Sequence, residues 1–532
     1  MVCQLAILSL LLATIYRHSV AEAHARGDLR TYLRKPTSVT SSSLIKPRST
    51  SNSTYLNNAT APFSIDGSSL PYVEFDIGES YAGLLPIGHE DDKYFFWFVP
   101  SLNTSVQDEV VIWLNGGPGC SSLDGFLHAN GPFTWQPGTN APVPNTWAWS
   151  NLTNVVWVDQ PQGTGYSVGE AIVTSEGDVA KYFVAFWEEF VKLFGLQHAK
   201  VYLAGESYAG KYVPYIADAM LDRGNATAFD VSGILLYDPG VGDDIVQSEV
   251  PMVAFMNANP NSLPFDDTFK TYIQNTSAAC GYDTYLEEHL RFPPLGPLPS
   301  SDPGTDSEGN FLAECDIFTA IFEEINTLNP CFNIYQINQP CPIPWDVLGF
   351  PYSGYYLPST FPEPYFNLAG VKAALNVPAS TDWTICSSSS VFVNGTDSSP
   401  PSGLTGGPLE RVIEKTMNVI VANGALDMSS PTNGTLLVLQ NMTWNGARGF
   451  SNPPVQPLLV PSTLSSEEVQ ESMAGSGHLG SWVSERGLTF CEVFLSGHQV
   501  PEWQPSVAYR HIELLLGRIE NLSDVRPFTK QQ

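Results

Sequence analysis

The sequence YLAGESYAG, Tyr202–Gly210, leads a short apolar run into a serine with small residues around it. The apolar run predicts a strand, and KYVPYIADAMLDR after it predicts a helix. Gly205 and Ala209 permit a sharp strand-to-helix turn that would expose the hydroxyl of Ser207. A string of this kind is most often an ordinary turn, so a nucleophilic role depends on the rest of the chain. Glu206, directly before the serine, would oppose the negative charge that a serine nucleophile develops.

Segments typical of strands and helices alternate on both sides of this turn. Apolar, aromatic and β-branched runs predict strands that end in loops within 93–101, 109–117, 154–165, 231–239, 417–427 and 489–501. Apolar residues at helical spacing predict helices at 179–194, 211–223 and 505–519. This order indicates an α/β fold with a mostly parallel sheet and helices on both faces.

The stretch 250–365 differs in composition from its surroundings. It is rich in proline and holds a group of cysteines, Cys280, Cys315, Cys331 and Cys341. We interpret it as an inserted cap stapled by disulfides, not as an independent domain. It would separate a first core part at 66–249 from a second at 366–525, with a polar tail at 526–532.

The N-terminal segment predicts entry into the secretory pathway. Residues 1–25 join a short apolar run to alanines, as a signal peptide does, and the run is too short for a stable membrane span. Residues 26–65 are rich in Ser, Thr and Asn and predict a flexible leader or pro-segment. The polar C-terminus predicts no membrane anchor. Ten Asn-x-Ser/Thr acceptors predict N-linked glycans, at Asn52, Asn58, Asn103, Asn151, Asn225, Asn275, Asn394, Asn433, Asn441 and Asn521.

The charge balance and the metal-ligand patterns exclude other classes of function. Acidic residues outnumber basic ones by 54 to 24, and the net charge of −30 would repel nucleic acid. Self-repulsion of this kind falls at low pH, which suits an acidic compartment. Neither Cys-x-x-Cys nor His-Glu-x-x-His occurs, so we expect no metal and no cofactor.

Three polar residues on loops after predicted strands occur in the order Ser207, Asp427, His498. That order is expected when the nucleophile, the orienting acid and the base lie at successive strand ends of an α/β-hydrolase sheet. The base would remove the hydroxyl proton, and the acid would hold the imidazole and stabilise the imidazolium. Taken singly, the aspartate is better explained as a helix cap and the histidine as an ordinary loop residue.

The segment WLNGGPGCSS, Trp113–Ser122, ends a predicted strand in a glycine-rich loop. Backbone amides in such a loop are free to face a ligand, and an oxyanion hole needs two such donors. The alternative is a glycine-rich turn that serves only chain reversal.

Several strings together resemble the serine carboxypeptidase family, in the family's order over about residues 66–525. They are WLNGGPGCSS, GPF at Gly131–Phe133, DQPQGTGYS at Asp159–Ser167, GESYAGKYVP at Gly205–Pro214 and SGHQVP at Ser496–Pro501. The resemblance implies an α/β-hydrolase fold with an inserted cap. It also implies that Ser207 is the nucleophile, Asp427 the orienting acid and His498 the base.

The resemblance further implies roles for the residues around the triad. The backbone amides of Gly117 and Tyr208 would form the oxyanion hole. Asn115 and Glu206 would bind the terminal carboxylate of the substrate, and Trp113 would shape that wall. A protonated glutamate donates a hydrogen bond to a carboxylate, whereas an ionised one repels it. Acids clustered beside a bound carboxylate raise each other's proton affinity, so binding should be favoured at acidic pH.

The cysteines outside the cap are also interpreted through the resemblance. The chain has 8 cysteines, and removal of Cys3 with the signal peptide leaves an odd number, so at least one thiol is free or pairs with another chain. The resemblance implies a disulfide between Cys120 and Cys386 that ties the oxyanion loop to a later loop. Cys491 would then carry the free thiol, and its apolar strand favours an inert core residue. The pairing of the cap cysteines stays open.

Specificity is expected from SSLDGFLHANGPF, which follows the oxyanion loop. Asp124 and His128 would share one helical face, which the resemblance directs at the pocket for the departing residue. Asp124 would then favour a basic side chain; alternatively, it only caps the short helix. Three positions depart from the family pattern. Ala129 replaces a glutamate of the carboxylate-binding network, Ala425 replaces the first acid of Gly-Asp-x-Asp, and Gln499, a further pocket candidate, stands where Met or Glu is common.

The sequence therefore predicts an enzyme that removes single residues from the C-termini of peptides and proteins through an acyl-enzyme. It would act outside the cell or in a vacuole-like or lysosome-like compartment. The same site is also compatible with acyl transfer to a small alcohol or amine. A third alternative is a non-catalytic binding glycoprotein that keeps the scaffold, and the intact triad weighs against it.

Overall fold

A computed structural model of the chain describes residues 53–88, 91–349, 363–462 and 474–529. The predicted signal peptide and most of the predicted leader lie outside the described residues. Within the described ranges, no helix combines the length and the apolar character needed to cross a membrane.

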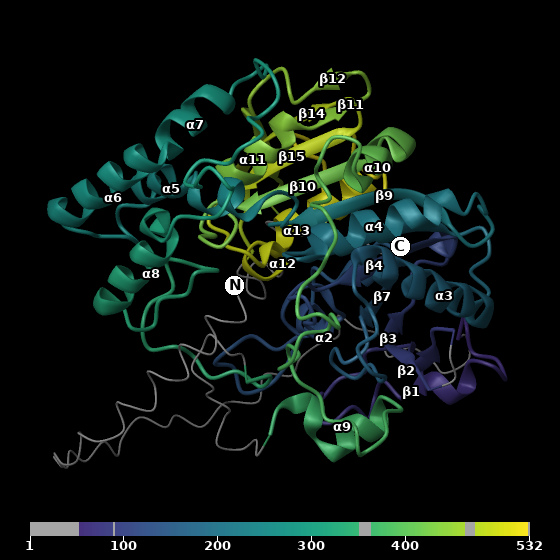
Figure 1. Ribbon diagram of the computed structural model, residues 1–532. Helices are drawn as coiled ribbons and strands as arrows, with labels where there is room; N and C mark the ends of the chain where they lie inside the picture. Colours follow the sequence, from purple (N-terminus) through teal and green to yellow (C-terminus); the bar gives the residue numbers. More distant parts are fainter. Residues whose placement is uncertain (1–52, 89–90, 350–362, 463–473, 530–532) are drawn as a thin grey trace, which may run out of the picture. The chain divides into compact units, whose positions relative to one another are not determined.

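The described residues form an eleven-stranded sheet, seen through the middle of the fold in Figure 1. In sheet order the strands are β1 (Ser64–Ile65), β2 (Ser80–Pro86), β3 (Lys93–Val99), β7 (Asn154–Asp159), β4 (Glu109–Leu114), β8 (Lys200–Glu206), β9 (Asp230–Tyr237), β10 (Val419–Gly424), β15 (Leu488–Val493), β14 (Gly477–Glu485) and β13 (Gln456–Val460). Neighbouring strands from β7 to β15 are parallel, and both edges are antiparallel. The parallel centre of the expected α/β-hydrolase sheet is thus confirmed.

Both faces of the central strands are buried, as strand β4 illustrates. Val110, Ile112 and Leu114 belong to one hydrophobic core, and Val111 and Trp113 belong to the other. Successive side chains of a strand point to opposite faces, so a strand covered on both sides is apolar throughout. This explains why EVVIWL has no alternation of polar and apolar residues.

Helices cover the two faces of the sheet. Helices α3 (Glu176–Phe194), α4 (Ala209–Asp222) and α10 (Pro408–Thr416) pack together over the first core. Helix α13 (Pro505–Leu515), preceded by α12 (Val500–Trp503), contributes to the second core. The termini of α3 follow capping chemistry: the side chain of Ser175 accepts the N–H of Asp178, and Gly195 ends the helix at φ 68°.

The segment between β9 and β10 contains the expected insertion. Its helices are α5 (Met252–Ala258), α6 (Asp267–Cys280), α7 (Tyr282–His289) and α8 (Ile317–Leu328). The cap cysteines pair with one another, Cys280 with Cys315 and Cys331 with Cys341, which resolves the pairing left open by the sequence. Residues 350–362 lie outside the described ranges, and the limits of the insertion at 250 and 365 stay a prediction.

The last part of the predicted leader or pro-segment is ordered. The carboxylate of Glu79 accepts the backbone N–H groups of Thr54 and Tyr55 at 2.9 and 2.8 Å, and the Tyr55 ring packs edge-on against Phe98. Strand β1, which begins at Ser64, pairs with β2. One buried aromatic ring and a row of backbone hydrogen bonds therefore order a stretch whose composition suggested flexibility.

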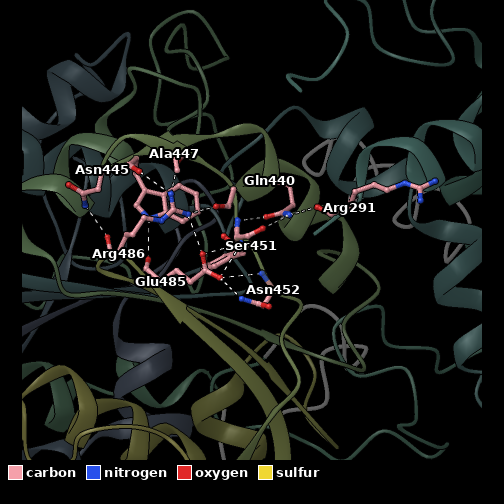
Figure 2. A network of polar contacts seen from close by, with 11 residues as sticks. Arg291, Gln440, Asn445, Ala447, Ser451, Asn452, Glu485 and Arg486 are labelled. Atoms are coloured by element: carbon pink, nitrogen blue, oxygen red, sulfur yellow. Dashed lines mark hydrogen bonds and ion pairs between the residues drawn. The ribbon is translucent and has the colours of Figure 1, made fainter. Parts of the chain in front are cut away.

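A polar network joins the turn between β14 and β15 to a neighbouring loop, as Figure 2 shows. Glu485 accepts the backbone N–H of Ser451 at 3.0 Å and that of Asn452 at 3.2 Å. Arg486 donates to the carbonyl of Ala447 at 2.9 Å. These side chains supply hydrogen-bond partners to the backbone of segment 447–452 and so join it to the end of β14.

Candidate active site

Ser207 lies at the turn between β8 and α4, as the sequence predicts. Its φ of 64° is in the left-handed region that serine rarely adopts, and its N–H donates to the carbonyl of Tyr237 at 2.9 Å. A Cβ atom on Gly116 would lie 2.4 Å from the backbone nitrogen of Tyr208, and one on Gly205 would lie 2.7 Å from a carbonyl of β4. The backbone packs so closely around this turn that only glycine fits at positions 116 and 205.

The predicted acid and base meet in the folded chain. Asp427 follows β10, and His498 follows β15, which is the next strand of the sheet. The imidazole Nδ1 lies 2.6 Å from Oδ2 of Asp427, and both residues are buried. A carboxylate can only accept a hydrogen bond, so Nδ1 donates and Nε2 remains the acceptor. Oδ1 of the aspartate accepts the N–H of Ser429 at 2.8 Å, which fixes the carboxylate plane.

The glycine-rich loop after β4 packs against the turn that carries the serine. Gly117 and Gly119 have φ values of 113° and 84°, which a side chain would strain. Tyr208 is the N-cap of α4, where backbone N–H groups have no partner within the helix. The loop is held by the disulfide Cys120–Cys386, and the predicted pairing is present.

Cys491 carries a free thiol, buried in β15. Burial raises the pKa of this thiol far above its usual value. The thiolate is the reactive form, so the position suits an inert core residue, as the sequence predicted.

Asn115 lies at the start of the glycine-rich loop with its amide oriented by three neighbours. Its Oδ1 accepts the indole N–H of Trp113 at 2.6 Å and the N–H of Gly125 at 3.3 Å. Its Nδ2 donates to Asp124 at 3.3 Å. A Cβ atom on Gly125 would lie 2.2 Å from the Trp113 indole nitrogen, so this glycine permits the close packing.

The carboxylate of Asp124 contacts the two other predicted specificity residues, His128 and Gln499. His128 Nδ1 lies 2.8 Å from Oδ1, and the Gln499 side chain donates to Oδ2 at 3.0 Å. Ser122, not Asp124, occupies the N-cap of α2 (Leu123–Gly125), so the capping alternative is wrong. The two predicted neighbours do share a face, because a π-helical turn at Phe126–Asn130 continues α2. A preference for basic side chains stays a prediction.

Comparison with known proteins gives the family. A profile described as serine carboxypeptidase matches residues 71–518. A probable serine carboxypeptidase of Arthroderma benhamiae is 46% identical over 481 residues, covering 88% of each chain. Serine-type carboxypeptidase F of Aspergillus niger is 44% identical over 487 residues, covering 88% of this chain and 89% of that one. The chain belongs to the serine carboxypeptidase family.

A solved structure agrees on the fold. The prohormone-processing carboxypeptidase Kex1Δp of Saccharomyces cerevisiae aligns with a TM-score of 0.65 at 22% identity, covering 87% of this chain and 98% of that one. At that identity the likeness concerns the α/β-hydrolase architecture alone.

Glu206 has a raised pKa within this serine carboxypeptidase site. Burial raises its pKa well above the usual range, and the nearby Asp124, Glu502 and Asp427 add to the effect. No donor contacts its Oε2 in the part of the chain that the structure describes. A protonated carboxyl group needs no counter-charge, so its environment favours the neutral form.

The sequence did not indicate three acids around this site, Asp238, Asp346 and Glu502. His128 is buried between Asp124 and Asp346, whose oxygens lie 2.8 and 3.3 Å from its ring nitrogens. Burial alone lowers the pKa of this imidazole, but the two carboxylates raise it well above the usual range. Burial, opposed by that imidazole, raises the pKa of Glu502 to about 8. Asp238 follows a predicted strand, which was a usable signal.

Proposed function

We propose that this serine carboxypeptidase releases single residues from the C-termini of peptides and proteins through an acyl-enzyme on Ser207. The contact that carries the proposal is the 2.6 Å distance between Nδ1 of His498 and Asp427. These groups and the serine follow β15, β10 and β8, whose parallel ends share one edge of the sheet. A nucleophile, a base and an orienting acid in this arrangement define acyl transfer.

In the proposed reaction, Nε2 of His498 takes the hydroxyl proton as Ser207 attacks the carbonyl carbon of the terminal peptide bond. The backbone amides of Gly117 and Tyr208 stabilise the oxyanion. The same imidazole then gives the proton to the departing amine, and a water molecule repeats the sequence to free the acyl group. Asp427 holds the imidazole and stabilises its charged form throughout.

Selection of chain ends is assigned to Asn115 and a protonated Glu206. The side-chain amide of Asn115 is held by Trp113, and the raised pKa of Glu206 keeps a proton available for a carboxylate. Ionisation would replace a donated hydrogen bond with repulsion, so peptide binding should weaken as pH rises. We therefore assign the activity an acidic optimum.

The disulfide bonds of the chain support a location outside the cytosol. Three disulfides join cysteines of the described chain, and such bonds persist in oxidising compartments. Together with the predicted signal peptide and glycan acceptors, they support a secreted or vacuole-like location.

The proposal is tested with a blocked dipeptide acid and its matched amide. The enzyme should release the free amino acid from the acid, and an organophosphonate should label Ser207 and stop the reaction. Ser207→Ala should lose about 10³-fold or more in kcat. Release of internal fragments, acyl transfer to an added alcohol with no hydrolysis in its absence, or labelling at another residue would contradict the proposal.

A further inference from the structure

Asp238 lies between the nucleophile strand and the strand of the orienting acid. It follows β9 directly, and β9 is paired with β8 on one side and β10 on the other. Its φ of 43° turns the chain back at this point, and its N–H donates to the carbonyl of Ala422 in β10 at 2.8 Å. The side chain is fully buried.

The carboxyl group of Asp238 is held beside the Asp427–His498 pair. One oxygen of each aspartate and one nitrogen of His498 lie within 4.8 Å of one another. Oδ1 of Asp238 accepts the backbone N–H of Gly424 at 2.8 Å. Oδ2 meets no donor within the described residues. Asp427 already accepts from the imidazole and from Ser429.

Two adjacent buried carboxylates that share one imidazole cannot both be ionised at low cost. A proton on Oδ2 of Asp238 would remove the like charge and give that oxygen an acceptor, the carboxylate of Asp427. We propose that Asp238 is a positioning residue that stays protonated and donates a hydrogen bond to Asp427, holding it for His498. The inference rests on the proposed function, because it assigns Asp427 to the triad.

The surroundings favour the same protonation state. Burial, and then the charge of Asp427, raises the pKa of Asp238 well above its usual range. Glu206 at the end of β8 adds a further acid, and Tyr237 beside it is neutral because burial raises its pKa. The charged partner in this group is the imidazole of His498 when protonated, and it already faces Asp427.

The test compares wild type with Asp238→Asn and Asp238→Leu on a blocked dipeptide amide, which removes the pairing of Glu206 with a substrate carboxylate from the measurement. Asparagine keeps an acceptor for the N–H of Gly424 and a donor for Asp427. Its kcat should therefore stay within about threefold of wild type, with the same pH profile. Leucine removes the donor, so kcat should fall roughly 10- to 100-fold with KM unchanged. The acid limb of kcat/KM should also move to higher pH. Without the hydrogen bond from position 238, the carboxylate of Asp427 keeps more of its negative charge, and that charge stabilises the protonated imidazole of His498.

An Asp238→Asn variant as impaired as Asp238→Leu would overturn the inference, as would a Leu variant with wild-type kcat and pH profile. If the Leu variant does not fold, difference infrared spectra of wild type and Asp238→Asn decide. Wild type at pH 6 should show the carbonyl band of a protonated carboxylic acid that the variant lacks, and absence of that band overturns the inference. Failure of wild type to release amino acids, with this band present, would count against the proposed function only.

Discussion

Acids in two regions of the molecule respond to pH in opposite ways. The acid cluster is defined as Glu206, Asp238 and Glu502, of which the first two are buried and the third is half-buried, and desolvation raises the pKa of each member. Glu485, the last residue of β14, is partly buried. Burial alone would raise its pKa, but the N–H groups of Ser451 and Asn452 outweigh that effect and lower it. Complete burial with few donors therefore raises the pKa of an acid, and partial burial with several N–H donors lowers it.

The difference separates groups that serve chemistry from groups that serve stability. A carboxyl with a raised folded pKa contributes stability below its unfolded pKa and loses it as pH rises toward the folded pKa. A carboxyl with a lowered folded pKa contributes stability above its unfolded pKa and loses it as pH falls. Substitutions that remove the hydrogen-bond donor of a protonated acid should accordingly affect activity in the first region, and neutralising substitutions should affect stability in the second.

The largest effect is expected for Asp427→Asn. The amide can donate to His498 and so favours the wrong imidazole tautomer, and kcat should fall about 10⁴-fold, as in other triads. The melting temperature should stay near that of wild type, because the asparagine amide keeps an oxygen that can accept the N–H of Ser429. Steady-state kinetics and thermal unfolding measure both. A lower melting temperature with kcat retained would break the distinction between the two regions.

A smaller effect is expected for Glu206→Gln, and it should depend on pH. Wild type should lose kcat/KM for a blocked dipeptide acid as pH rises through the raised pKa of Glu206. Glutamine donates at every pH, so the alkaline limb should move upward, with a gain of about tenfold for each pH unit of displacement on that limb. The matched amide substrate is the control, and its profile should not move. Equal displacement for both substrates would show that Glu206 does not bind the carboxylate.

Much of the fold, and the positions of Ser207, Asp427 and His498 after strands, followed from local sequence. Strands covered on both faces are largely apolar, and Ser207, Asp427 and His498 each stand in the turn or loop after one. The disulfide Cys120–Cys386 followed from the resemblance to the family, which fixes a pairing 266 residues apart that local pattern does not show.

The position of Asp238 after a strand was visible in the sequence, but the roles of the acids around the site could not be predicted because they depend on sheet order and burial. Asp238 acquires its neighbours only because β9 lies between β8 and β10, which sequence order does not state. Asp346 reaches His128 from the inserted segment, more than 200 residues away in sequence. Tyr55 shows the converse, since an aromatic residue within a polar stretch helps to anchor it, together with backbone hydrogen bonds to Glu79.

The smallest change in activity is expected for Glu485→Gln, together with a loss of stability. Glutamine cannot accept the N–H groups of Ser451 and Asn452 with a full negative charge, which should cost about 1–2 kcal/mol in the free energy of unfolding at pH 7. Because the folded pKa of Glu485 is lowered, its contribution is present above the unfolded pKa and is lost as pH falls through the folded value. Urea unfolding should therefore separate variant from wild type at pH 7 and bring them together in acid, whereas kcat stays unchanged. Glu287→Gln, at an exposed position of α7, is the matched control and should alter neither quantity. A stability difference that persists in acid would assign the effect to packing instead of charge.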